Sequence, residues 1–146
     1  MAGTLGSNEW GRRAGETVFR HQTGLIPTNC LIELLVGSTI IDPATDRSVM
    51  TPVTDANYAP QNIDMATLMA AFVGKQAVTA IALNFGTAAA AGGPVTGILF
   101  NAGATLGTPL TTFWFYLIFA SPWTFAAGSP ILVPPGYIGL QAGEPN

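Results

Sequence analysis

A chain of 146 residues is long enough for one domain with its own hydrophobic core and too short for two ordinary domains. Hydrophobic residues make up 49% of the chain and charged residues only 9%, against about 25% charged residues in a typical soluble domain. The net charge of −3 provides no basic surface that would neutralise phosphates, which argues against direct binding of nucleic acid.

Residues 1–24 are predicted to form an extended or partly helical arm. Charged side chains surround two isolated aromatic residues there, and the segment has too few apolar residues to bury a core of its own. We therefore expect the arm to order against a neighbouring subunit. The residues expected to make this contact are Trp10, Arg12, Arg13, Phe19 and Arg20. No apolar segment follows the basic residues as it would in a secretory signal, so synthesis in a host cytoplasm is expected.

From residue 25 onward, short apolar segments alternate with turns rich in Gly and Pro. Residues 30–36 alternate between two faces and predict a strand, with Leu31, Glu33 and Leu35 on one face and Cys30, Ile32, Leu34 and Val36 on the other. Residues 42–62 contain Asp-Pro, Thr-Pro and Asn, which favour turns, so a long loop with short extended pieces is expected. Residues 65–73 fit a helix by propensity or a buried strand by position, and the strand is favoured.

The C-terminal half contains the remaining predicted strands. They are expected at residues 77–85, 95–100, 111–119, 130–133 and 137–140, with an Ala-rich linker after the first of them. Many short strands with regular turns predict an all-β fold, a β-sandwich or jelly-roll formed by residues 25–146 as a single domain.

The predicted strand at residues 111–121 is apolar on both faces. One face carries Phe113, Phe115, Leu117 and Phe119, and the other carries Trp114, Tyr116, Ile118 and Ala120. A strand at a protein surface has one face toward solvent, so this pattern favours cover by a partner subunit, the alternative being cover by the chain's own N-terminal part or long loop. The predicted oligomer interface consists of Trp114, Tyr116, Ile118 and, shortly after the strand, Trp123.

The same region carries no charge between Lys75 and Glu144, but Gly and Pro interrupt it before about 20 apolar residues accumulate, so no membrane-spanning helix is predicted. Recognisable chemistry is also missing. His21, the only histidine, lies in the arm, where a catalytic group would lack rigid support. Cys30, the only cysteine, is expected to be a buried, inert thiol. The sequence thus predicts neither an enzyme nor a cofactor site.

The acidic residues of the long loop are expected to cap turns. These residues are Asp42, Asp46, Asp55 and Asp64. A calcium site is the alternative, because carboxylate oxygens on a loop suit that ion, but DPATD (residues 42–46) lacks the alternating acids and the glycine of an EF-hand loop. No metal is therefore predicted.

Residues 28–140 resemble a family of small structural proteins of tailed bacteriophages that are labelled tail-fibre or minor capsid proteins. The resemblance lies in PTNCLIELLV (residues 27–36), in the position of Tyr58, in AVTAIALNFGTAAAAG (residues 77–92) and in WTFAAGSPILVPPGYIGL (residues 123–140). The chain departs from the family in having Ser129-Pro130 in place of a charged turn, and in its low overall charge.

This resemblance implies a virion component that adds to a capsid or tail as a homotrimer. The function expected first is that of a capsid decoration (cement) protein on the capsid surface, which clamps neighbouring copies of the phage major capsid protein. The alternative is a structural protein associated with a tail or fibre, with residues 42–58 as a loop that contacts the host surface.

Overall fold

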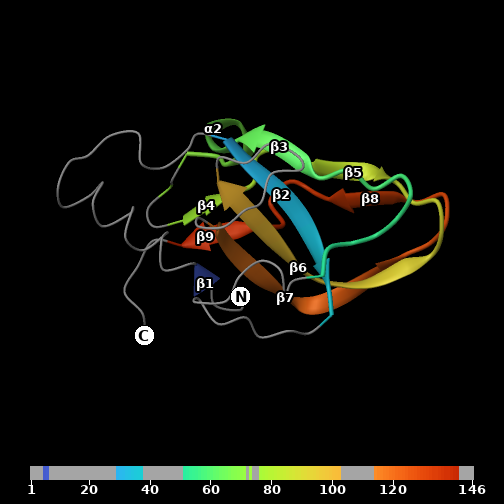
Figure 1. The fold of residues 1–146 in the computed structure, drawn as a ribbon. Coiled ribbons are helices and arrows are strands. Elements are labelled where there is room, and N and C mark those ends of the chain that lie inside the picture. The colour runs from blue at the N-terminus through green and yellow to red at the C-terminus, as the bar shows by residue number, and fades with distance from the viewer. Residues whose placement is uncertain are drawn as a thin grey trace.

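The computed structural model of the protein describes residues 5–6, 29–37, 51–71, 73, 76–102 and 114–141. Most of these residues lie in β-strands, and the helix among them is the four-residue α2 (Met65–Leu68) (Figure 1). The all-β prediction is confirmed. The predicted arm, residues 1–24, lies outside the described residues except for β1 (Leu5–Gly6). Among the described helices, none has the length and apolar character needed to cross a membrane.

The largest sheet has five strands in the order β1-β7-β6-β2-β3, and all its neighbours are antiparallel. Its other strands are β2 (Asn29–Val36), β3 (Gln61–Asp64), β6 (Gly92–Ala102) and β7 (Trp114–Phe125). The strand predicted at residues 30–36 is therefore confirmed, whereas β3 falls partly in the segment that was predicted to be a loop.

Two short antiparallel sheets pair the remaining strands. One joins β4 (Gln76–Val78) to β9 (Gly139–Gln141), and the other joins β5 (Leu83–Thr87) to β8 (Pro130–Val133). The strand predicted at residues 77–85 is thus interrupted at residues 79–82. Pro134 and Pro135 lie opposite the interruption, and proline has no backbone N–H to continue a ladder of hydrogen bonds.

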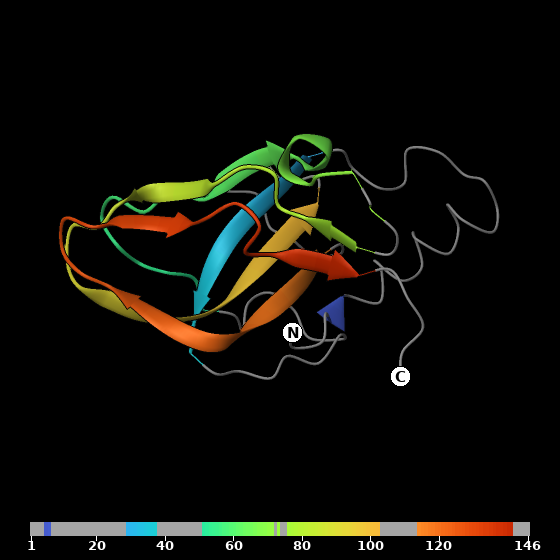
Figure 2. The same ribbon diagram turned by 180° about the vertical axis from the view of Figure 1, so that it is seen from behind.

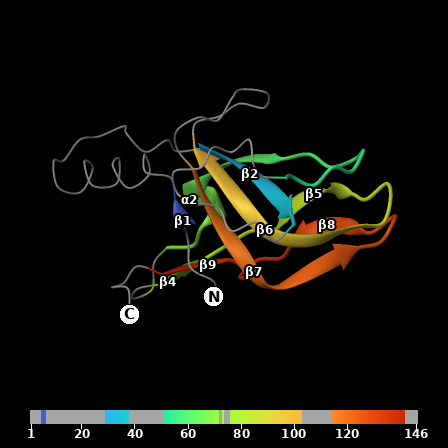
Figure 3. The ribbon, with the colours of Figure 1, turned by 60° about the horizontal axis from the view of Figure 1, so that its bottom comes forward.

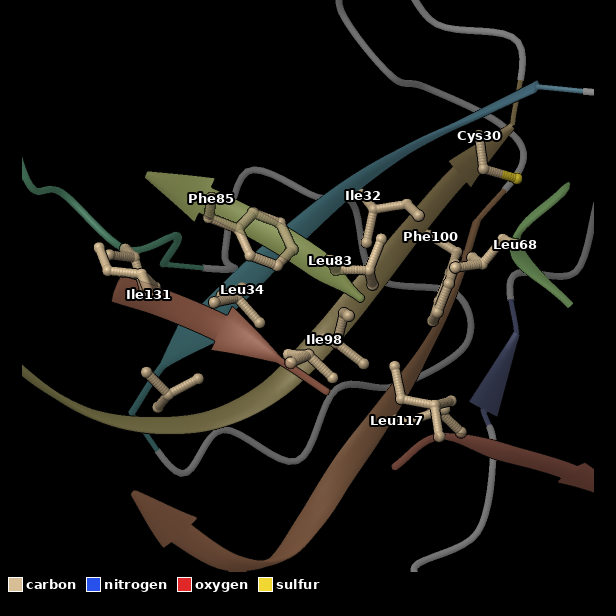
Figure 4. Close-up of a cluster of buried hydrophobic side chains, with 14 of the residues drawn as sticks. Cys30, Ile32, Leu34, Leu68, Leu83, Phe85, Ile98, Phe100, Leu117 and Ile131 are labelled. Carbon is tan, nitrogen blue, oxygen red and sulfur yellow. The ribbon is translucent and has the colours of Figure 1, made fainter. Parts of the chain in front are cut away.

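The hydrophobic core lies between the five-stranded sheet and the two short sheets (Figures 2 and 4). Its fully buried residues come from both sides. The largest of them are Phe85, Phe100, Ile32, Leu34, Leu68, Leu83, Ile98, Leu99, Ile131 and Val95. All of these except Leu99 belong to one contiguous cluster. Leu99 is buried on the opposite face of the five-stranded sheet.

Residues 65–68 form a helical turn, so the strand favoured for this segment is wrong there. Asp64 at the end of β3 accepts a hydrogen bond from the backbone N–H of Thr67 (3.0 Å), and this cap starts the turn. Strand-like pairing resumes immediately afterwards, because Met69 forms an isolated bridge with Thr79. The short helix places Leu68 in the core.

β7 is longer than predicted because it passes through a bulge. Val95 pairs with Trp123 and Gly97 with Ile118, so between these pairs one residue of β6 stands against four of β7. A bulge of this kind bends a strand and re-aims its side chains. Pro122 is tolerated in this stretch because it is exposed.

Candidate interaction surfaces

The five-stranded sheet buries side chains on both of its faces. Along β2, Cys30, Ile32 and Leu34 belong to the core cluster. The alternate residues Leu31 and Leu35 lie outside that cluster, yet they are only 3% and 7% exposed within a single chain. We call the face that carries Leu31, Leu35 and Leu99 the second face. These side chains of β2 and β6 on the second face are therefore buried within a single chain, without a second copy.

A buried polar pair lies on the second face. The side-chain amide of Asn101 donates a hydrogen bond from Nδ2 to Oε2 of Glu33 (3.1 Å), and the two residues are 0% and 5% exposed. The other amide atom of Asn101, Oδ1, is buried and has no hydrogen-bond partner. Burying these groups costs free energy unless they are hydrogen-bonded, so the pair fixes how β2 and β6 pack on this face. The sequence pattern placed Glu33 on this face but could not reveal its partner.

The strand register relates the predicted oligomer interface to this polar pair. Across the sheet, Glu33 stands opposite Leu99, which stands opposite Tyr116. In the adjacent row, Asn101 stands opposite Trp114. The side chains of Trp114 and Tyr116 lie outside the described residues. Their backbone positions nevertheless lie in the same two cross-strand rows as Glu33 and Asn101.

Two further residues of the predicted interface have described side chains. Ile118 is half-buried. Trp123 is also half-buried, and it packs against the core cluster with its ring edge-on to Phe125 (centroids 6.3 Å apart, 62° between planes). Trp123 is therefore in part a core residue. The predicted arm contacts, Trp10, Arg12, Arg13, Phe19 and Arg20, lie outside the described residues.

The described part of the long loop, residues 51–60, is fastened to the β5–β6 turn by Asp55. One carboxylate oxygen, Oδ1, accepts hydrogen bonds from the N–H groups of Asn57 (2.9 Å) and Ala89 (3.0 Å). The other oxygen, Oδ2, accepts from Ala89 (3.0 Å) and Ala90 (3.1 Å). These bonds, chiefly those from Ala89 and Asn57, lower the pKa of Asp55 below its ordinary 3.8. Asp55 thus caps turns, as the sequence predicted.

Tyr58 attaches the same loop to the core. Its hydroxyl accepts a hydrogen bond from the backbone N–H of Leu34 (2.7 Å), and its ring stacks on Phe85 (centroids 5.5 Å apart, 7° between planes). The N–H of Ala59 also donates to the carbonyl oxygen of Phe85 (2.8 Å). The loop is therefore a packed part of the fold over these residues.

We expect Asp55→Asn to destabilise the protein in a pH-dependent manner. The folded-state pKa is depressed, so the ionised carboxylate contributes stability above the pKa of the unfolded chain, about 3.9, and loses it as the pH falls through the folded-state pKa. Urea unfolding should show a constant difference from wild type above about pH 5 and a shrinking one below about pH 4.

Asn57→Ala is the matched control for this measurement. It removes the hydrogen bond from Nδ2 of Asn57 to the carbonyl oxygen of Thr87 (3.0 Å) and leaves the backbone bond to Asp55 in place. The destabilisation by Asn57→Ala should be the same above about pH 5 as below about pH 4. A pH-independent effect of Asp55→Asn would show that the carboxylate charge does not hold the loop.

Two hollows lie at the surface of the described residues. One of about 280 Å³ lies between β2, the Asp55 loop and the start of β6, and Phe125 forms part of its wall. The other, of about 220 Å³, is lined by residues 117–121 of β7 and residues 137–139. Tyr137 at the rim of the second hollow is 49% exposed. No group of three or more His, Cys, Asp or Glu side chains that could hold a metal ion occurs among the described residues.

Cys30 is 3% exposed, and burial raises the pKa of its thiol to about 11. The prediction of a buried thiol is confirmed, and the high pKa keeps it protonated and unreactive at neutral pH.

No protein-family model and no curated protein matches this sequence. The function is therefore inferred from the residues and their arrangement.

Proposed function

We propose that this protein is a structural component of a bacteriophage virion, and specifically a capsid decoration protein. It forms a homo-oligomer, most simply a trimer, on the capsid surface and clamps neighbouring copies of the major capsid protein. We further propose that the five-stranded sheet and the two short sheets form a β-sandwich of the jelly-roll type. The resemblance of residues 28–140 to small structural proteins of tailed phages supports both proposals.

The observation that carries the proposal is the shortage of charged residues in the C-terminal half. The sequence has no charged residue from residue 76 to residue 143, and β7 carries apolar residues at successive positions in this span. Four of the exposed large hydrophobic residues among the described ones lie in this span: Val78, Ile81, Leu132 and Tyr137. Exposed apolar residues that gather on a surface are typical of an interaction site. Because Leu31, Leu35 and Leu99 are covered within one chain, the proposed contact with another copy lies toward the β7 side of the sheet. Ile118 and the positions of Trp114 and Tyr116 belong to that side.

Purified protein should be a stable oligomer in solution. In size-exclusion chromatography with light scattering, Ile118→Arg should shift it toward a monomer, since a buried unpaired charge opposes association. Thr124→Arg adds the same charge at an exposed position of β7 and should leave the oligomer intact. A monomeric wild-type protein would count against the proposed assembly.

The number of copies in a particle distinguishes a decoration protein from the second candidate, a tail or fibre protein. A protein that covers a capsid is present in hundreds of copies, and quantitative mass spectrometry of purified virions measures this number. A few tens of copies would place the protein on the tail. The packing of Tyr58 on Phe85 favours the capsid, because this loop aromatic supports the fold instead of presenting a free contact surface.

A further inference from the structure

The two short sheets follow one another as a single interrupted ribbon. Residues 76–87 run antiparallel to residues 130–141, with β4 paired to β9 and β5 to β8. Between the two pairs, the N–H of Thr79 donates to the carbonyl oxygen of Ile138 (2.9 Å), and the N–H of Gly136 donates to that of Thr79 (2.7 Å). Figures 1 and 3 show the β4–β9 pair and the β5–β8 pair one after the other along the molecule. We call these two segments the outer ribbon.

The side of the outer ribbon that faces away from the core is apolar. Alternate residues of β5 and β8, among them Phe85 and Ile131, belong to the core cluster, so the residues between them point outward. Four of the five exposed large hydrophobic residues among the described ones lie on this ribbon. They are Val78 (43% exposed), Ile81 (36%), Leu132 (38%) and Tyr137 (49%).

The other exposed positions of the outer ribbon add almost no polar surface. Between residues 78 and 84 and between residues 130 and 137 they hold Ala, Pro and Gly, apart from Asn84. The side chain of Asn84 is already engaged, because its Oδ1 accepts a hydrogen bond from the N–H of Gly86 (3.0 Å). An exposed apolar patch without charges is typical of a contact with another macromolecule.

Tyr137 provides this patch with a rigid anchor. Its ring meets the ring of Phe119 edge to face (centroids 5.6 Å apart, 71° between planes), and its N–H donates to the carbonyl oxygen of Pro134 (3.3 Å). Half of the side chain is nevertheless exposed. A tyrosine that is already held in place loses little freedom on binding, and tyrosine is enriched among residues that dominate binding energy.

The distribution of charge indicates which partner fits the patch. The charged residues within the described part of the chain are Glu33, Asp55 and Asp64, all acidic and none on the outer ribbon, and the whole chain has a net charge of −3. Copies of an acidic chain repel each other where acids meet, but not at this patch. A charged partner would find no opposite charge here, whereas a second copy offers a neutral apolar surface of the same shape.

We infer that the outer ribbon packs face to face against the outer ribbon of a second copy. The two ribbons stack as sheets do, about 10 Å apart, in a contact that uses the same patch on both copies. Five exposed positions at residues 78–84 and six at residues 130–137 compare with about 20–30 residues a side in a standard interface, so this association is reversible. The inference rests neither on the contact proposed at β7 nor on a role in a virion.

Opposite charges at Leu132 test this contact. Leu132→Glu and Leu132→Lys are compared with wild type by sedimentation velocity over about a hundredfold range of protein concentration, because self-association depends on concentration. Each variant alone should self-associate about tenfold more weakly or worse, since like charges face each other across the contact. An equimolar mixture of the two should recover the lost association, because Glu then faces Lys.

Thr124→Glu and Thr124→Lys are the matched controls. They place the same charges at an exposed position of β7, outside the outer ribbon, and should leave this association unchanged, alone or mixed. All variants are also measured in the Ile118→Arg background, where the contact proposed at β7 does not contribute. Failure of that contact would leave the effect of Ile118→Arg absent and the effects at Leu132 present, so the two proposals fail separately.

Three outcomes would overturn the inference. Association of both Leu132 variants at wild-type strength would mean that the patch is not a contact between copies. Weakened association that the mixture does not recover would mean that the patch meets a different surface of the second copy. Unchanged self-association combined with reduced binding of Leu132→Glu to virus particles would assign the patch to another protein.

Discussion

Leu99→Ala should lower the free energy of unfolding by about 2–5 kcal/mol, as expected for a fully buried leucine replaced by alanine. Leu99 is 0% exposed although it lies on the second face of the five-stranded sheet, away from the core cluster. The neighbouring variant Ile98→Ala removes a core residue that is equally buried, and it should cost a similar amount. Denaturant unfolding at two protein concentrations measures both effects.

Leu132→Ala is the matched control for the first prediction. Leu132 is 38% exposed on β8, so its replacement should cost less than about 1 kcal/mol. If Leu99→Ala behaved like this control in dilute protein and weakened only the oligomer, the second face would be covered by another copy. The proposed interface would then extend across β6.

Gly86→Ala should destabilise the protein by about 3 kcal/mol or more, because two costs combine at this position. The backbone of Gly86 has a φ of 116°, which side chains disfavour. A Cβ atom there would also lie 2.2 Å from the carbonyl oxygen of Asn57, so the Asp55 loop would have to move. Denaturant unfolding measures the loss of stability. Faster hydrogen exchange of the Ala59 amide, which bonds to Phe85, would show that the loop next to Gly86 has been loosened.

Gly128→Ala separates these two costs. Gly128 also has a positive φ, 78°, but no atom lies within 4 Å of the position that a Cβ would take. Its replacement should therefore cost only about 1–2 kcal/mol, the conformational part. Equal effects of the two substitutions would mean that close contact between Gly86 and the loop contributes nothing.

The predictions made from local pattern agree with the structure over two of the short apolar segments. β2 and β8 lie where they were expected, and the burial of Cys30 was foreseen. The failures have local causes that depend on contacts. Asp64 caps a helical turn where a strand was favoured, and prolines in a distant segment interrupt the strand at residues 79–82.

For the candidate surfaces too, the sequence pattern predicted local features and missed those that depend on contacts between distant residues. The pattern identified the apolar character of β7 and the position of Glu33 on the second face, because side chains alternate along any strand. It could not identify Asn101 as the partner of Glu33, since these residues are 68 positions apart in the chain. The hydrogen bond from Ala89 to Asp55 could not be predicted for the same reason, because these residues are 34 positions apart.

The sequence by itself determined that this protein is built of short strands with few charges, because periodicity and composition are properties of the chain. Only the tertiary structure decided which strands are neighbours, and in what register. The pairing of the strands buried Leu99 and Asn101 on the second face, and among the described residues it left the edge of β7 from Leu117 onward without a neighbouring strand on that side. The physical reason is that alternation assigns a residue to a face, whereas its neighbours on that face depend on pairing between distant segments.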